Sequence, residues 1–363
     1  MPNRARPVIC VSLLAFVPHS MSEQHGRMVT EIVRSASLAN LLGAPPEARV
    51  SVYLPPGYDA SVRKRYPVLY LLHGYGSSEA EWTAVTPERG IHGRDLRGLM
   101  DSLIAVGAVK EMVIVMPNAS NRLGGSFYVN SVTTGNWETF VTRDLIAHID
   151  STYRTMPRAE SRGIAGVSMG GYGTFYLSMR HGGDTYAAMY AMSACCSVPF
   201  SFDTSMMTHA WDTIGASASF DALDRAETPT MEGIVLSIMV AASAALVPDA
   251  DKPPLFFDAL EARRNGTMVV NEAATARWNE HLPRFMIARS RVRLRRMRAI
   301  QFDVGAQDEA VHPSEIIGMD SAFTRAGIPH TFELYQGTHT SRITERLATH
   351  VLPFFSRNLV FAP

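Results

Sequence analysis

The hydrophobic positions of this chain form short apolar runs that alternate with longer helical patterns. Residues 50–54 alternate like an early strand, and a turn follows at 55–58. Five more runs have the length and composition of buried strands, namely 66–72, 112–116, 163–167, 299–304 and 331–335. Helical patterns lie between them at 96–106, 137–153, 170–180 and 313–325. This alternation predicts an α/β protein with a mostly parallel sheet and helices on both faces.

The alternation lapses between about 199 and 283. Within this segment, residues 234–247 form an apolar run of 14 residues. That length suits a buried helix or a cap helix better than a membrane span. The segment separates two strands that should be neighbours in the sheet, so it predicts an insertion before the last strands. The insertion would be a lid or the wall of a substrate pocket, or alternatively a purely structural extension.

Composition and charge are those of a large globular protein. With 363 residues, 46% hydrophobic and 19% charged, the chain can bury one sizeable core. We therefore expect one domain over 23–363 that contains the insertion. The formal net charge is zero, which gives no electrostatic reason to bind nucleic acid or an anionic membrane. The basic run 291–298 is the exception, and we interpret it as a solvated helix face, the alternative being a polyanion site.

The amino-terminal residues have the pattern of a signal peptide. Arginines precede an apolar run at 8–17, and small residues follow it. This pattern predicts a signal peptide over 1–22 and a secreted or periplasmic protein, because the run is too short to span a bilayer. Alternatively, translation begins at Met21 or Met28 and the protein remains in the cytoplasm.

The cysteines indicate no disulfide framework. Of the three, Cys10 would leave with the signal peptide. The adjacent Cys195 and Cys196 are poorly placed to bridge across the fold. No Cys/His spacing suggests zinc, so the sequence predicts neither a metal nor a cofactor.

The segment 163–173, with the sequence GIAGVSMGGYG, carries the chemistry. Gly166, Ser168 and Gly170 have the G-x-S-x-G spacing, with an apolar strand before them and a helix after them. In that context the motif is a nucleophile elbow, in which the serine sits on a sharp turn that only glycines can flank. Alternatively, it is a small-residue turn that packs a helix on a sheet.

The order of the remaining candidates favours the elbow. Serine needs a neutral imidazole to accept its proton and a carboxylate to orient that imidazole. In this fold the acid and then the histidine follow the nucleophile, and both lie after strands. Asp308 and His339 follow the runs 299–304 and 331–335 in this way. Asp303 and Glu309 are alternative acids, and an ordinary surface histidine is the alternative for His339.

An oxyanion hole would need two backbone N–H groups. One comes from the residue after the nucleophile, Met169. The other should come from the loop after an earlier strand, where the run 66–72 ends in His-Gly-Tyr-Gly, and Tyr75 is the candidate. His73 precedes the nucleophile, so we expect it to brace this loop rather than to act as the base.

Substrate-binding candidates lie near the long loop 117–131. This loop is polar and aromatic and follows a strand, so it would lie over the cleft. It would bind substrate or, alternatively, hold itself together through hydrogen bonds. We predict substrate contacts from Asn130 in this loop, from Trp137 after it, and from Trp82 behind the His-Gly-Tyr-Gly segment.

These motifs together resemble one known group. The His-Gly-Tyr-Gly segment with Trp82, the elbow at Ser168, the Asp303-x-Gly305-x-x-Asp308 segment and Gly337-x-His339 are similar to the esterase D group of α/β-hydrolases. That group includes feruloyl and acetyl esterases, enterochelin esterases, S-formylglutathione hydrolases and the antigen 85 mycolyltransferases. The resemblance covers roughly 49–197 and 299–359, and it implies an α/β-hydrolase fold. S-formylglutathione hydrolase matches less well, because 199–283 is long for that compact enzyme.

Three functions follow from these observations. The first is a serine carboxylesterase acting on small or medium acyl esters, including those of carbohydrate-linked acids, through an acyl-enzyme on Ser168. The second is an acyltransferase with the same acyl-enzyme, in which an alcohol outcompetes water. The third is a non-catalytic binding protein on a hydrolase scaffold, since a fold does not by itself secure a function.

Overall fold

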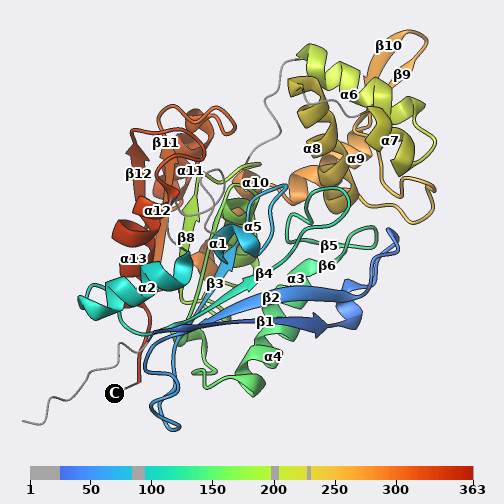
Figure 1. Cartoon of the computed structure of the whole chain (residues 1–363). Helices are drawn as coiled ribbons and strands as arrows, with labels where there is room; N and C mark the ends of the chain where they lie inside the picture. The colour runs from blue at the N-terminus through green and yellow to red at the C-terminus, as the bar shows by residue number, and fades with distance from the viewer. Residues whose placement is uncertain (1–24, 84–94, 198–203, 227–229, 363) are drawn as a thin grey trace, which may run out of the picture.

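The computed structural model describes residues 25–83, 95–197, 204–226 and 230–362. An eight-stranded sheet runs through the molecule in the order β1-β2-β4-β3-β7-β8-β11-β12 (Figure 1). Its strands are β1 (Arg27–Arg34), β2 (Glu47–Leu54), β3 (Val68–Leu72), β4 (Val113–Pro117), β7 (Arg162–Val167), β8 (Ala188–Met192), β11 (Ala299–Gly305) and β12 (Thr331–Tyr335). The pairs β1/β2 and β2/β4 are antiparallel, and the other neighbours are parallel. The predicted mostly parallel sheet is confirmed.

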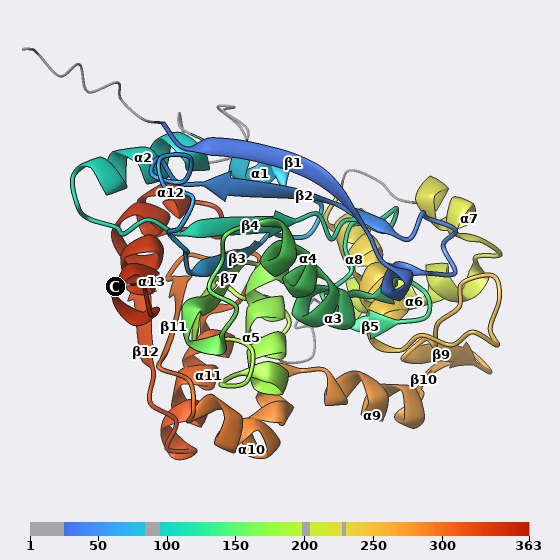
Figure 2. The same cartoon turned by 90° about the horizontal axis from the view of Figure 1, so that it is seen from below.

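Helices cover both faces of this sheet (Figure 2). Those outside the insertion are α1 (Ala80–Thr83), α2 (Leu96–Ala105), α3 (Trp137–Thr139), α4 (Leu145–Thr152), α5 (Met169–His181), α10 (Pro283–Leu294), α11 (Pro313–Arg325), α12 (Ile343–Arg346) and α13 (Leu352–Asn358). A π-helical turn joins α3 to α4 and another joins α12 to α13, at Phe140–Asp144 and Leu347–Val351. Short 3-10 turns lie at Ala36–Leu38 and Ala159–Ser161. The predicted helices at 96–106, 137–153, 170–180 and 313–325 are all present.

The central strand β3 shows why its sequence is apolar throughout. All five of its residues are fully buried. Val68, Tyr70 and Leu72 belong to a core that includes residues of α4 and α5, whereas Leu69 and Leu71 belong to a second core with α2 and α13. Successive side chains of a strand point to opposite faces of the sheet. A run without polar residues therefore requires cover on both faces.

Two strands of the sheet were not predicted from the sequence. β1, with the sequence RMVTEIVR, lies at the edge of the sheet and is partly exposed, so half of its positions are polar. β8, with the sequence AMYAM, lies between β7 and β11 and is fully buried. Alanine and methionine have weak strand preference, so only its position in the sheet identifies β8 as a strand.

Apart from α10, which packs on α5, the segment between β8 and β11 forms a separate group of elements, on the upper right in Figure 1. Besides α10, it comprises α6 (Thr204–Ala216), α7 (Phe220–Ala226), α8 (Met231–Leu246), the hairpin β9 (Glu261–Arg264) and β10 (Thr267–Val270), and α9 (Glu272–Glu280). The predicted apolar helix at 234–247 corresponds to α8, and its second half is buried. Ser131 Oγ donates to the Ala244 carbonyl at 2.6 Å, which attaches α8 to the loop after β4. The small hairpin β5 (Asn130–Ser131) and β6 (Gly135–Asn136) belongs to that loop.

Two further predictions concern the ends and the charge of the chain. The predicted signal peptide over 1–22 lies outside the described residues. No helix in the described ranges is long and apolar enough to cross a membrane. In the basic run 291–298 the arginines are exposed, and Arg296 pairs with the exposed Asp184 at 2.8 Å. The run is therefore a solvated face, as interpreted from the sequence.

Candidate active site

Ser168 lies on a sharp turn between β7 and α5. Its backbone has φ 56° and ψ −117°, a conformation that side-chain-bearing residues rarely adopt. The turn brings backbone into direct contact on both sides of the serine. A Cβ at Gly166 would overlap the backbone of Gly170, and a Cβ at Gly170 would overlap the backbone of Leu72. The two glycines of the motif are therefore required by sterics, as the nucleophile elbow predicts.

Asp308 and His339 form a hydrogen-bonded pair. His339 Nδ1 lies 3.0 Å from both carboxylate oxygens of Asp308, whose side chain is fully buried. The backbone N–H groups of Ala310 and Val311 donate to Asp308 Oδ1 at 3.0 and 2.8 Å. These donors hold the carboxylate in place, and the hydrogen bond to the carboxylate fixes the tautomer that carries its proton on His339 Nδ1. Nε2 of the neutral imidazole is then an acceptor, as a general base requires.

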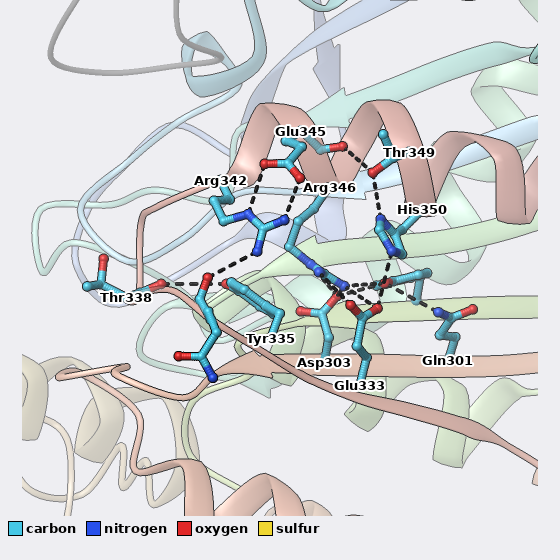
Figure 3. Close-up of polar contacts among 12 residues, drawn as sticks. Gln301, Asp303, Glu333, Tyr335, Thr338, Arg342, Glu345, Arg346, Thr349 and His350 are labelled. Atoms are coloured by element: carbon cyan, nitrogen blue, oxygen red, sulfur yellow. Dashed lines mark hydrogen bonds and ion pairs between the residues drawn. The ribbon is translucent and has the colours of Figure 1, made fainter.

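The alternative acids have other partners. Asp303 is buried inside β11, where its Oδ2 accepts from Arg346 Nε at 2.8 Å (Figure 3). The same oxygen accepts from Tyr190 Oη at 2.7 Å. Glu309 accepts a hydrogen bond from the backbone N–H of His339 at 3.2 Å, not from its imidazole. Of the three carboxylates considered, the structure places Asp308 against the imidazole.

The sheet brings the three predicted catalytic residues to one edge. Ser168 follows β7, Asp308 lies in the loop after β11, and His339 lies in the loop after β12. These strands and β8 are consecutive, parallel neighbours, so their carboxyl ends share an edge. This edge is where ligands bind in open α/β sheets.

The two oxyanion candidates flank this edge. Met169 is the first residue of α5, so its N–H has no acceptor within the helix. The positive end of the helix dipole lies at the same place and favours a developing negative charge. Tyr75 lines the cavity that contains Ser168. Its loop is fixed on both sides, because the Gly74 N–H donates to Glu81 Oε2 at 3.1 Å and the Gly76 N–H donates to Gly124 O at 2.9 Å.

His73 braces this loop from inside the protein. It is fully buried; its Nε2 accepts from the Ala119 N–H at 2.8 Å, and its Nδ1 donates to Gly74 O at 2.8 Å. Acceptance at Nε2 requires the neutral ring, and burial lowers the pKa of His73 to about 4. The structural role expected from the sequence fits this geometry.

We expect this burial to make the fold sensitive to acid. A histidine with a folded pKa of about 4 and an unfolded pKa of about 6.5 destabilises the fold as the pH falls between those values, because the unfolded chain alone takes up the proton. For His73 the loss at pH 4 is at most about 3 kcal/mol. His281, whose pKa burial lowers to about 4, adds to the loss in the same window.

The measurement is the free energy of urea unfolding between pH 7 and 4. His73→Gln retains an acceptor for the Ala119 N–H without a titrating ring, so its stability should fall less steeply with pH than that of the wild type. His209→Gln, at an exposed position of α6, is the control for loss of a histidine as such. If the free energy of unfolding fell equally steeply with pH in the wild type and in His73→Gln, His73 would not be a source of the acid sensitivity.

A cavity of about 290 Å³ contains Ser168. The residues that line it besides the serine are Tyr75, Phe127, Cys195, Cys196, Met231, Ile234, Ile238, Glu309, Ala310, Val311, His312 and Glu315. Met231, Ile234 and Ile238 come from the first turns of α8 and lie at the spacing of one helix face. The insertion therefore forms one wall of the cavity, and that wall is apolar. The sequence predicted a wall or lid in general, but not which of its residues face the serine.

The three predicted substrate-binding residues do not line this cavity. Trp82 is buried in the core beneath α2. Asn130 is exposed and holds Thr139, donating to Thr139 Oγ1 at 3.0 Å and accepting from the Thr139 N–H at 2.9 Å. Trp137 is buried, and its Nε1 donates to Thr134 O at 2.9 Å. All three have structural contacts instead, since an aromatic or amide side chain that follows a loop can equally well anchor it.

Most of the contacts of the long loop 117–131 hold the loop in place. Tyr128 is buried and donates from its hydroxyl to His73 O at 3.0 Å. Arg122 reaches Asp221 and Asp224 of α7 at 2.7 and 2.8 Å. Within this loop, Phe127 contributes to the cavity. Of the two interpretations, the hydrogen-bonding one accounts for most of the loop.

No sequence pattern predicted the two cysteines of the cavity. Cys195 and Cys196 do not bridge distant parts of the chain, but the structure joins them to each other in a disulfide. They lie just after β8, directly beside the elbow.

Comparison with known proteins agrees with this architecture. An endo-1,4-beta-xylanase/feruloyl esterase from Xylanibacter ruminicola is 37% identical over 136 residues, which are 36% of this chain and 17% of that protein. Esterase Rv1288 from Mycobacterium tuberculosis is 34% identical over 138 residues, 37% of this chain and 26% of the other. The chain thus spans about a quarter or less of the length of these curated relatives.

Solved structures match over nearly the whole chain. A ferulic acid esterase superposes with a TM-score of 0.61 at 24% identity, covering 92% of this chain and 99% of that one. An S-formylglutathione hydrolase from Agrobacterium tumefaciens gives 0.55 at 15% identity, covering 93% and 97%. At such identities the likeness shows the fold, which is the α/β-hydrolase fold expected from the sequence. The family model described as "Putative esterase" matches residues 44–345, most of the chain. The chain therefore belongs to this esterase family.

Proposed function

We propose that this chain is a serine carboxylesterase that hydrolyses small or medium acyl esters through an acyl-enzyme on Ser168. The observation that carries the proposal is the pair of contacts from His339 Nδ1 to the buried carboxylate of Asp308, at 3.0 Å each. This pair lies at the sheet edge where the elbow presents the serine. Membership of the esterase family supports the same reaction.

The proposed reaction has two halves. His339 Nε2 accepts the proton of Ser168 Oγ as the oxygen attacks the ester carbonyl, and Asp308 stabilises the imidazolium. The amides of Tyr75 and Met169 stabilise the oxyanion. The imidazolium then protonates the leaving alcohol, and the acyl group remains on the serine. In the second half His339 takes a proton from water, which attacks the acyl-enzyme and releases the acid.

The cavity supports an apolar acyl group of limited size. Its volume of about 290 Å³ lies near the lower end of the range for ligand pockets, roughly 300–1,000 Å³. The aromatic rings of Tyr75 and Phe127 line it together with the apolar side chains of α8. We propose that the insertion forms the acyl-binding wall. A hydroxycinnamoyl group, suggested by the names of the feruloyl esterase relatives, fits this lining in polarity.

The test is hydrolysis of 4-nitrophenyl esters from acetate to laurate, with methyl ferulate alongside. We expect kcat/KM to peak at a short or medium acyl chain and to fall at laurate, because the cavity cannot enclose that chain. Inertness of the wild type on every ester would contradict the proposal. Ester formation with added glycerol, in place of acid release, would instead indicate acyl transfer.

The variant Ile238→Ala sharpens this test. Removing three carbons from the α8 wall should raise the kcat/KM ratio of decanoate to butyrate about 10-fold, since each methylene in an apolar pocket is worth about 1–3 kcal/mol. Ile317→Ala makes the same change at an exposed position of α11, outside the cavity lining, and should leave the ratio unchanged. Identical profiles for the two variants would remove α8 from the acyl site.

A further inference from the structure

Two adjacent sulfur atoms lie in the wall of the cavity that contains Ser168. Cys195 is half-buried and Cys196 is buried, and both line this cavity. The structure joins them in a disulfide. Neither residue has a part in the proposed reaction. Because the cavity opens to solvent along the exposed Met231 and Ile234, a small reagent that enters it can reach the sulfur atoms.

The backbone of this segment is attached to the elbow itself. The Ser168 N–H donates to Met192 O at 3.0 Å, and the Cys195 N–H donates to Ser168 O at 3.2 Å. Both backbone groups of the serine are therefore held by the segment that carries the sulfur pair. Cys196 has a φ of 59°, in the left-handed region that non-glycine residues rarely adopt. A covalent link to Cys195 would help to hold it there.

We propose that Cys195–Cys196 is a reversible redox-modification site in the wall of the acyl cavity, and that its ligands are small dithiols and thiol-reactive electrophiles. Its position in the acyl cavity rests on the proposed function. In the reduction, a dithiol such as dithiothreitol attacks one sulfur, the cysteine S–S bond breaks, and two cysteine thiols form. The dithiol loses two electrons and two protons and closes to its cyclic disulfide. Each freed thiolate can then displace iodide from iodoacetamide to form a thioether.

The first experiment detects the reduction of the cysteine pair by chemical labelling and does not depend on enzyme activity. The full chain is treated with iodoacetamide before and after dithiothreitol, and peptide 181–225 is weighed after trypsin digestion under non-reducing conditions. This peptide contains both cysteines and lacks Cys10. We expect no label before reduction and two labels after it. Labelling of the untreated protein would overturn the proposal.

The second experiment locates the effect in the acyl cavity. Reduction should lower kcat/KM for 4-nitrophenyl butyrate on the order of 10-fold, because the serine loses part of its fixed position. Alkylation of the two thiols should remove most of the remaining activity, because the added groups fill the cavity. In the double variant Cys195→Ser with Cys196→Ser, the ratio of rates with and without dithiothreitol should be one. Full activity of the reduced, alkylated wild type would overturn the placement.

The two experiments separate this proposal from the esterase proposal. If the wild type hydrolyses no ester, the proposed function fails, whereas the labelling result still decides whether the sulfur pair is a redox site. If ester hydrolysis is strong and peptide 181–225 is labelled without reduction, only the sulfur proposal fails.

Discussion

Ser168→Ala is expected to lower kcat for ester hydrolysis by about 10⁴- to 10⁶-fold, the range for loss of a nucleophile that acts as a unit with its base. The loss should come from chemistry and not from unfolding. The hydrogen bonds that hold the elbow use the backbone N–H and carbonyl of residue 168, and alanine retains both. The residual rate would come from the oxyanion site and from binding.

The measurement is kcat on 4-nitrophenyl butyrate, with circular dichroism to compare the folds. Ser178→Ala is a matched control, because Ser178 lies on α5, the helix that follows Ser168, is fully buried, and has a hydroxyl without a hydrogen-bond partner in the described part of the chain. That variant should keep the wild-type rate. An Ser168→Ala enzyme with full activity would mean that the elbow is only a packing turn.

Arg346→Met is expected to cost about 3–5 kcal/mol of stability, the usual effect of removing one partner of a buried ion pair. Arg346 is 2% exposed and donates hydrogen bonds to the fully buried Asp303 and to Glu333 (Figure 3). It also donates to Tyr190 Oη. Burial raises the pKa of Asp303 to about 6, and the guanidinium of Arg346 opposes that shift. Without the guanidinium, the carboxylate would be left buried and uncompensated.

Urea unfolding at pH 7 measures this loss. Glu345→Gln is the control on the same helix, because it breaks an exposed pair with Arg342 and should change the stability little. The double variant Arg346→Met with Asp303→Asn should recover part of the stability, since the buried charge is then gone. A loss for Arg346→Met no larger than that for Glu345→Gln would show that the buried network contributes little.

The elements that could be predicted from sequence were those whose own residues carry a full hydrophobic or steric pattern. The strand β3 is apolar at every position, so its burial on both faces could be expected from those residues alone. The elbow could be located because a side chain at residue 166 or 170 would overlap the backbone of the turn or of the adjacent strand, so both positions must be glycine. β8, with its alanines and methionines, lacks such a pattern.

The choice of acid shows where sequence reasoning stops. Asp303, Asp308 and Glu309 lie within seven residues of one another, and spacing left all three open. In the folded chain these three carboxylates have different hydrogen-bond partners. Asp303 meets the guanidinium of Arg346, Glu309 the backbone of His339, and Asp308 its imidazole.

The amino-acid sequence by itself therefore determined the α/β class and the position of the sharp turn at Ser168, because these depend on hydrophobic period and local sterics. The roles of Ser168, Asp308 and His339 stay predictions that rest on their order along the chain. The tertiary structure alone decided that α8 and the cysteine pair line the cavity and that Trp82, Asn130 and Trp137 do not. Those contacts join residues that are tens of positions apart in the chain, and no local pattern encodes them. They form only when the sheet aligns its strand ends and the insertion folds over that edge.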